Sequence, residues 1–171
     1  MEVIKIIREA DIGESSPIPP IYKERVAARA VVFDTEGKVA LLHVTKKGYH
    51  KLPGGGVEEG EDIPTALARE LQEEIGCAVR NIQELGIIEE YRSHKFNEHQ
   101  TSHCFVADLS GEKGVPHLDD DEVAEGSEPV WVSLEEAIAI LDEVDVDAYG
   151  VKFMRLRDLT FLKEAQRILR S

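Results

Sequence analysis

The sequence predicts an α/β protein in which a mixed β-sheet lies between layers of helices. Three observations support this prediction: β-prone segments before and after one strong helix at residues 62–76, a capped helix at about 133–143, and an amphipathic segment at 149–170. Strands with helices before and behind them favour an α/β/α sandwich on a mixed sheet. The length of 171 residues is sufficient for a full core.

One domain is therefore expected over residues 1–171. It has three expected parts: an N-terminal strand and Pro-rich arm at 1–24, a core at 25–145 and a C-terminal helix at 146–171. Within the arm, Met1 to Glu9 contains apolar residues typical of a short strand. The linker that follows, Asp11 to Pro20, contains three prolines and separates the arm from the body.

The expected core begins with a β-hairpin. Val26 to Phe33 is strongly β-prone, Asp34 to Gly37 forms a turn, and Val39 to Val44 returns as the second strand. Tyr49 to Leu52 then leads into Pro53 and the helical segment.

The segment from Gly55 to Cys77 contains a glycine loop, a cluster of acids and one helix. Asp62 is a good N-cap, and Gly76 is a natural end for the helix. The residues between them have high helix propensity. Apolar side chains at helical spacing would anchor this helix on the core: Leu67, Leu71 and Ile75.

Two strands are expected after this helix. Val79 to Tyr91 reads as one bent strand or two short ones, with a bulge at Gly86. Thr101 to Leu109 reads as a buried strand, and the polar segment from Arg92 to Gln100 is expected to be the loop between them.

The C-terminal third begins with a long acidic loop, Gly111 to Glu128, and a last strand, Pro129 to Val132. Ser133 is the expected cap of the next helix, which starts with a capping box. Tyr149 to Arg170 is expected to be a long helix that is interrupted or kinked near Asp158. Its basic residues predict a solvated face, with two alternatives: attraction of the helix to the acidic body, or cations placed near a phosphate.

Three carboxylates crowd one patch of the first helix. At about 100° per residue, Glu70, Glu73 and Glu74 lie within roughly 100° of arc. Like charges at this spacing destabilise a helix, so they are either solvated or neutralised by a cation. Clustered carboxylate oxygens suit hard cations such as Mg²⁺ or Mn²⁺.

The spacing of these acids is part of a longer pattern. Gly55 is followed after five residues by Glu61, and after seven more by Arg69-Glu70-Leu71-x-Glu73-Glu74-x-Gly76. This pattern resembles the Nudix box, with every charged and glycine position filled. Two positions depart from the family: Cys77 replaces a larger aliphatic residue, and His50 stands where many members have Trp. The resemblance implies a Nudix-like α/β/α sandwich over about residues 25–145.

The resemblance also implies roles for the box residues. Glu70, Glu73 and Glu74 would be the principal ligands of Mg²⁺ or Mn²⁺, and Glu73 and Glu74 would be catalytic together with Arg69. Arg69 and Glu61 would orient the ligands, and a contact between Arg69 and Glu73 is reasonable at a spacing of four residues.

Glycines give backbone close access to the expected site. The run Gly54-Gly55-Gly56 would let the main chain approach metal or substrate, with Gly55 as a metal contact. Tyr91 is a further candidate for substrate binding, because a tyrosine beyond the box occurs in the Nudix hydrolases of dinucleoside polyphosphates.

The helix acids leave the base for the attacking water unassigned. Nudix enzymes often recruit an additional acid from a loop before the last core strand, and here this loop contains Glu122 and Glu125. Either could be a general base or an extra metal ligand. The alternative is a solvated acidic turn.

The resemblance implies a metal-dependent hydrolase that cleaves the pyrophosphate bond of a nucleoside diphosphate linked to another group X. A nucleoside triphosphate is slightly preferred as substrate. ADP-ribose, nucleotide sugars and dinucleoside polyphosphates stay open. A Nudix-fold sensor that holds a nucleotide without cleaving it is the second alternative, although such modules commonly lose the acids that this chain keeps.

Composition limits the expected partners. A net charge of −14 argues against nucleic-acid binding by phosphate neutralisation. Neither a signal peptide nor a long apolar segment is recognisable, so we expect a soluble cytoplasmic protein without a membrane partner. The expected partner is a small-molecule nucleotide, and a homodimer is an open alternative. The two cysteines are too few for a disulfide framework.

Overall fold

The computed structural model describes residues 1–94, 96–143 and 145–171. The strands are β1 (Val3–Ile7), β2 (Lys23–Phe33), β3 (Val39–Val44), β4 (Tyr49–Lys51), β5 (Gly54–Gly56), β6 (Ala78–Arg92), β7 (Glu98–Ser110) and β8 (Ser127–Val132). The helices are η1 (Glu9–Ile12, a 3₁₀ helix), α1 (Ile63–Ile75), α2 (Asp120–Glu125), α3 (Leu134–Asp142) and α4 (Tyr149–Leu169).

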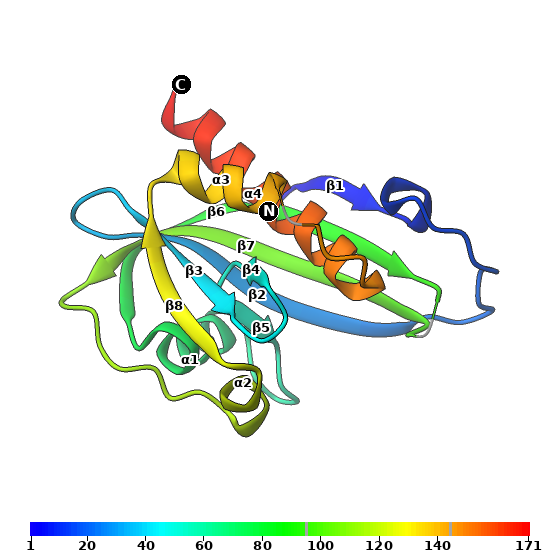
Figure 1. The fold of residues 1–171 in the computed structure, drawn as a ribbon, viewed down its shortest axis with the longest axis horizontal. Helices are drawn as coiled ribbons and strands as arrows, with labels where there is room; N and C mark the ends of the chain where they lie inside the picture. The colour runs from blue at the N-terminus through cyan, green and yellow to red at the C-terminus, as the bar shows by residue number, and fades with distance from the viewer. Residues whose placement is uncertain (95, 144) are drawn as a thin grey trace.

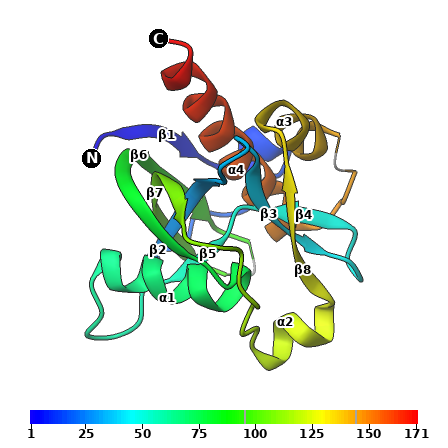
Figure 2. The ribbon, with the colours of Figure 1, turned by 90° about the vertical axis from the view of Figure 1, so that its left-hand side faces the viewer.

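All of these strands belong to one mixed sheet. Its order is β1-β6-β7-β2-β3-β4, with β5 paired to β2 and β8 paired to β3. The β1–β6 and β2–β7 pairs are parallel, and the others are antiparallel. Helices α1 and α2 lie on one side of the sheet, and α3 and α4 lie on the other (Figures 1 and 2). The predicted α/β/α sandwich on a mixed sheet is confirmed.

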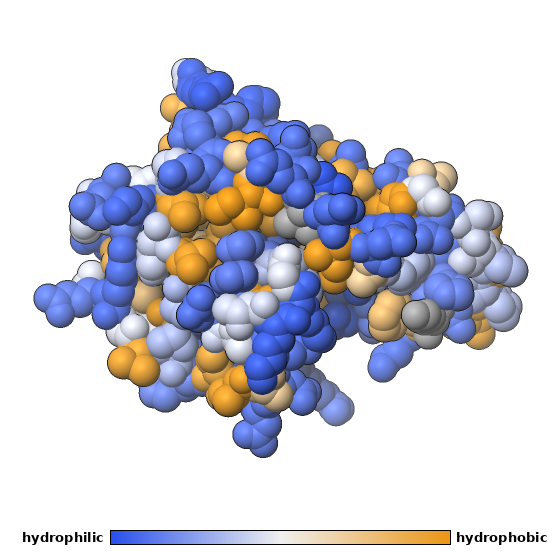
Figure 3. All heavy atoms as spheres, viewed as in Figure 1, coloured by the Kyte–Doolittle hydropathy of each residue, from blue (hydrophilic) through white to orange (hydrophobic). Residues whose placement is uncertain are grey.

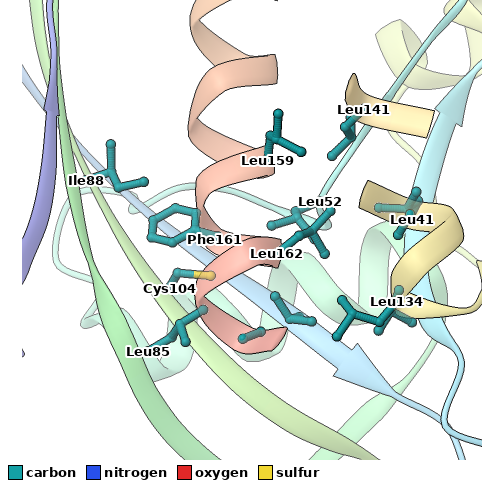
Figure 4. Close-up of a cluster of buried hydrophobic side chains, with 14 of the residues drawn as sticks. Leu41, Leu52, Leu85, Ile88, Cys104, Leu134, Leu141, Leu159, Phe161 and Leu162 are labelled. Atoms are coloured by element: carbon teal, nitrogen blue, oxygen red, sulfur yellow. The ribbon is translucent and has the colours of Figure 1, made fainter. Parts of the chain in front are cut away.

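The core has two parts, one on each face of the sheet. Beneath α3 and α4, Phe161 and Leu162 pack with sheet residues such as Leu41, Ile88 and Cys104 (Figure 4). Beneath α1, the predicted apolar stripe is buried against the small side chains of β2: Leu67, Leu71 and Ile75 on Ala28, Ala30 and Val32. Burial of these side chains fixes which face of α1 is left for the carboxylates.

The ends of α1 agree with the sequence prediction. The Asp62 carboxylate accepts a hydrogen bond of 2.9 Å from the Thr65 N–H. The helix ends where Gly76 adopts a left-handed conformation with φ of 64°. A Cβ at Gly76 would also lie 2.5 Å from the Val115 backbone, so glycine is required there for space as well as for conformation.

Most strand predictions are confirmed, but the loop predicted at Arg92 to Gln100 is too long. β6 continues to Arg92 and β7 starts at Glu98, so the connection is shorter, and Lys95 within it lies outside the described residues. Strand pairing continues because charged residues at the two strand ends face each other across the pair, as in the Arg92–Glu98 contact of 3.6 Å. The bulge at Gly86 is present as a register shift between Glu84 and Gly86.

The prediction of a long acidic loop at Gly111 to Glu128 is wrong in its centre. Asp119 caps α2, and a reciprocal capping box joins Asp119 to Glu122. A helix can start here because Asp119 at the N-cap and Glu122 three residues later satisfy backbone N–H groups that have no partner within the helix. Gly126 ends this helix, and β8 starts at Ser127, two residues earlier than predicted.

The predicted interruption near Asp158 does not occur, since α4 runs continuously from Tyr149 to Leu169. Arg157 and Asp158 are buried at 2% and 0% exposure and form an ion pair of 2.7 Å. Buried partners, rather than solvent, therefore satisfy the charged centre of this helix.

Hydrophilic side chains predominate on the face shown in Figure 3, as the acidic composition predicts. Among the helices of the described residues, none combines the length and the apolar character needed to cross a membrane.

Candidate functional site

Arg69 on α1 lies at the centre of a carboxylate network. Its guanidinium donates to both Glu61 oxygens at 2.9 and 3.0 Å, to Glu70 at 2.8 Å and to Glu73 at 3.1 Å. It also donates to the carbonyl of Gly56 at 3.0 Å, which joins α1 to β5. Hydrogen bonds from Glu61 and Glu70 raise the pKa of Arg69. The predicted Arg69–Glu73 contact is confirmed.

Glu74 lies on the buried side of the same helix, with 2% of its surface exposed. One carboxylate oxygen accepts the Gly54 N–H at 2.5 Å, and the other is 3.0 Å from the Lys51 ammonium. Burial raises the pKa of Glu74 to about 7, although Lys51 and Gly54 act in the opposite direction. Glu74 is thus held by β4 and β5 together.

The β5 glycines bring backbone against these carboxylates. A Cβ on Gly55 would lie 2.5 Å from a Glu70 oxygen, so any side chain there would displace the carboxylate. Gly54 has a φ of 130°, and a Cβ on it would lie 2.2 Å from the Ala28 carbonyl oxygen. Glycine at these two positions lets β5 lie between β2 and α1.

The donor chemistry of α1 fits a hard divalent cation, since Glu70, Glu73 and Glu74 supply carboxylate oxygens. Among residues 1–94, 96–143 and 145–171, however, no three Asp, Glu, His or Cys side chains already converge as a metal cluster. Instead, Arg69 binds Glu70 and Glu73, and Lys51 binds Glu74. These two cations neutralise the acids, so metal binding would require the carboxylates to reorient toward one another.

A cleft of about 340 Å³ opens beside these groups. Its lining contains Glu70, Glu74 and the backbone of β5, together with arginines from β2, β6 and α4. Of the residues predicted from sequence, Gly54–Gly56, Glu70, Glu74 and Glu122 line this cleft. Glu73 is bound to Arg69 and is 43% exposed.

A profile of the NUDIX domain matches residues 23–154. The chain belongs to the Nudix family. The uncharacterized Nudix hydrolase YvcI of Bacillus subtilis is 38% identical over 66 residues, which are 39% of this chain and 40% of YvcI. The CMP-5'-(N-acetyl-N-hydroxy-3-aminopropyl)phosphonate hydrolase of Streptomyces rubellomurinus is 30% identical over 119 residues, or 67% of this chain and 54% of that protein. The chain spans about half the length of the curated relatives that it matches.

Solved structures show the same fold. A NUDIX hydrolase from Nitrosomonas europaea superposes with a TM-score of 0.64 at 19% identity, covering 85% of this chain and 90% of that one. At this identity the likeness concerns the fold alone, and the Nudix architecture predicted from the box is confirmed.

The two acids predicted near the last strand of this Nudix fold occupy different places. Glu122 lines the cleft and accepts the Asp119 N–H at 3.1 Å in the α2 capping box. Glu125, one turn later, binds Lys47 instead. Their similar positions in the sequence therefore do not give them similar access to the Nudix-box helix.

Tyr91 lies outside the cleft. Its ring stacks on His99 with centroids 4.3 Å apart, and the Arg8 guanidinium lies 4.4 Å from its centroid. Because side chains alternate along a strand, Tyr91 and its neighbour Arg92 point to opposite faces of the sheet. Arg92 is the one that lines the cleft.

Sequence analysis missed the basic side of the cleft. Its arginines come from three elements: Arg25 and Arg29 on β2, Arg92 on β6 and Arg157 on α4. One signal was available, because an arginine inside the apolar run of β2 is unusual for a buried strand. The pairing of β7 with both β2 and β6 brings these arginines near one another, and local sequence does not predict that pairing.

Proposed function

We propose that this chain is a metal-dependent Nudix hydrolase that cleaves the pyrophosphate bond of a nucleoside diphosphate linked to X. The observation that carries the proposal is the contact of Arg69 with Glu61, Glu70 and Glu73, directly beside Glu74 and the glycine strand β5. A structural surface helix would gain little from gathering three acids around one arginine at the edge of a cleft.

The side chains have distinct proposed tasks. Glu70, Glu73 and Glu74, with the Gly55 backbone, would hold Mg²⁺ or Mn²⁺. When bound, such a cation neutralises diphosphate oxygens and lowers the pKa of water. Arg69 would orient Glu70 and Glu73, with Glu61 fixing the guanidinium from the opposite side.

The remaining residues would position the reactants. β5 would bring backbone close to the diphosphate, because Gly54–Gly56 carry no side chains to obstruct it. Glu122 is the better placed of the two candidate bases for the attacking water, since it lines the cleft.

The substrate class is part of the same proposal. A nucleoside triphosphate is our preferred substrate, and ADP-ribose, nucleotide sugars and dinucleoside polyphosphates are the alternatives. The name of the Streptomyces rubellomurinus relative denotes a hydrolase of CMP joined to a phosphonate, which supports a nucleotide linked to a second group. A non-catalytic sensor is less well supported, because the acids of the box helix are retained.

The test is a panel of nucleoside triphosphates, ADP-ribose, nucleotide sugars and dinucleoside polyphosphates, each incubated with Mg²⁺ or Mn²⁺. Products are resolved by anion exchange and identified by ³¹P NMR. We expect a nucleoside monophosphate with metal and none in EDTA. Glu73→Gln is the matched variant, because it keeps the side-chain size but removes the anion. Nucleotide binding by the wild type without product from any compound would support the sensor instead.

A further inference from the structure

Four arginines form a cationic surface inside an acidic protein. Arg25, Arg29, Arg92 and Arg157 all line the cleft and are here called the arginine wall. The chain has a net charge of −14, so a concentration of cations in its cleft is opposite to the charge of the whole molecule.

Arg29 is the least satisfied member of the wall. It is 5% exposed, and its Nη1 donates to the Gly54 carbonyl at 2.9 Å. Its Nε has no hydrogen-bond partner, and within the described residues no carboxylate forms an ion pair with it. A buried guanidinium without a directly bonded carboxylate is costly unless an anion is supplied, and Asp158, Glu90 and Glu74 act on Arg29 only at longer range. Burial and the neighbouring Arg157 lower its pKa to about 10, so it remains charged at neutral pH.

Arg92 supplies a second free donor. It is 8% exposed, and its Nη2 lies 2.7 Å from Glu90. Its Nε also has no partner among the described residues. Arg25 is more accessible, with 43% of its side chain exposed, and donates to the Gln100 amide oxygen at 3.0 Å.

The wall keeps a positive excess after its internal ion pairs are counted. Glu90 and Asp158 pair with Arg157, and Glu90 also pairs with Arg92. Glu98 lies near both Arg92 and Arg25. Four guanidinium groups therefore face three carboxylates. Planar guanidinium donors match the oxygens of a phosphate group.

Gly54 joins the arginine wall to the Nudix-box helix. Its N–H is donated to Glu74, and its carbonyl accepts from Arg29. A ligand that crosses Gly54 would therefore reach both the carboxylates of α1 and the arginine wall. One end of an extended substrate would then lie near the α1 carboxylates, and the other end near the arginine wall.

We propose that the arginine wall is a second anion subsite, which binds a phosphate group of the substrate outside the diphosphate held at the α1 carboxylates. This inference rests on the proposed function and narrows its substrates to those with a third phosphate, such as a nucleoside triphosphate or a diphosphate whose X group is itself phosphorylated. Arg29 and Arg92 each contribute an unpaired buried Nε donor, and Arg25 contributes a more exposed guanidinium.

The first test measures binding of inorganic phosphate in EDTA, by calorimetry and by amide chemical shifts, so that no hydrolysis is needed. Arg92→Gln and Arg25→Gln are compared with Arg80→Gln, an exposed arginine on the same strand as Arg92. We expect the first two variants to weaken phosphate binding by roughly tenfold or more, the scale of a lost charge-assisted hydrogen bond, and Arg80→Gln to leave it unchanged.

Arg25→Gln is included because its side chain is only partly buried, so this variant is expected to fold even if Arg92→Gln does not. Equal phosphate affinity in wild type, Arg25→Gln and Arg92→Gln would overturn the subsite, as would an equal loss in Arg80→Gln. In a second test with Mg²⁺, Arg25→Gln should lower kcat/KM more for a nucleoside triphosphate than for ADP-ribose, and an equal loss would also overturn it. Phosphate binding without hydrolysis of any nucleotide would leave the subsite in place and refute the hydrolase.

Discussion

The Lys51 ammonium lies 3.0 Å from the carboxylate of Glu74, an acid that is almost completely buried. Lys51 therefore neutralises the deepest of the three proposed metal ligands in the metal-free protein. Burial acts to lower the pKa of Lys51, but the Glu74 charge and hydrogen bond raise it overall. In the metal-free protein the Glu74 carboxylate is thus held by Lys51 and by the Gly54 N–H, at the cost of its own desolvation.

The first prediction concerns the pH dependence of stability without metal. The pKa of Glu74 is raised from its ordinary value of 4.5 to about 7 by burial. Between these two values the folded state keeps a proton that the unfolded state has lost, so stability falls as pH rises through this window. The full loss should be about 3 kcal/mol.

Glu74→Gln removes this titration and is the comparison variant. In EDTA, the unfolding free energy of the wild type minus that of the variant should decrease between about pH 4.5 and 8. Urea denaturation at several pH values measures it. A difference that is constant over this range would contradict a raised pKa for Glu74.

The second prediction concerns turnover. Glu73→Gln and Glu74→Gln should each lower kcat by on the order of 10²–10⁴, because a neutral amide is a poor ligand for a hard cation. Initial rates are measured at limiting Mg²⁺ with the best substrate of the panel, and circular dichroism checks the fold. Wild-type rates in both variants would show that the metal assignment is wrong.

The third prediction concerns Arg69. Arg69→Ala leaves Glu61, Glu70 and Glu73 without their common partner, so the metal-free protein should lose about 1–2 kcal/mol of stability. Saturating Mg²⁺ should restore part of this loss, since a ligand that binds the folded state stabilises it. Melting temperatures with EDTA and with Mg²⁺ measure both effects.

Arg80→Ala is the control for this prediction, because Arg80 is an exposed arginine outside the network. Its melting temperature should stay near that of the wild type in both conditions. If Arg69→Ala behaves in the same way as this control, Arg69 does not organise the carboxylates.

The fourth prediction separates the two acids of α2. Glu122→Gln should lower turnover by roughly 10²-fold and change the pH profile, because Glu122 lines the cleft and is our candidate base. Glu125→Gln should have little effect, since Glu125 is bound to Lys47. Turnover is followed from about pH 6 to 9.5 in both single variants and in the double variant. Full activity of the double variant would show that neither acid is the general base, and the base would then be sought among the acids of α1.

Local patterns were sufficient for the family and for the box helix. Asp62 and Gly76 set the ends of α1, and apolar residues at helical spacing set its buried face, because capping and periodicity act over a few residues. The Arg69–Glu73 contact could be predicted for the same reason. The α2 helix was also encoded locally, in the Asp119–Glu122 capping box, but its run of acids was read as a loop.

The sequence alone thus determined the fold class, the Nudix family and the clustering of acids around Arg69 on α1. Only the tertiary structure decided the cationic side, which depends on strand register and on the docking of α4. A shift of one residue in β6 would exchange Arg92 and Tyr91 between the faces of the sheet, because side chains alternate along a strand. Arg29 and Arg157 are distant in sequence and reach one cleft only because β2 and α4 pack together. Such contacts depend on burial of the whole core, and no spacing of residues along the sequence predicts them.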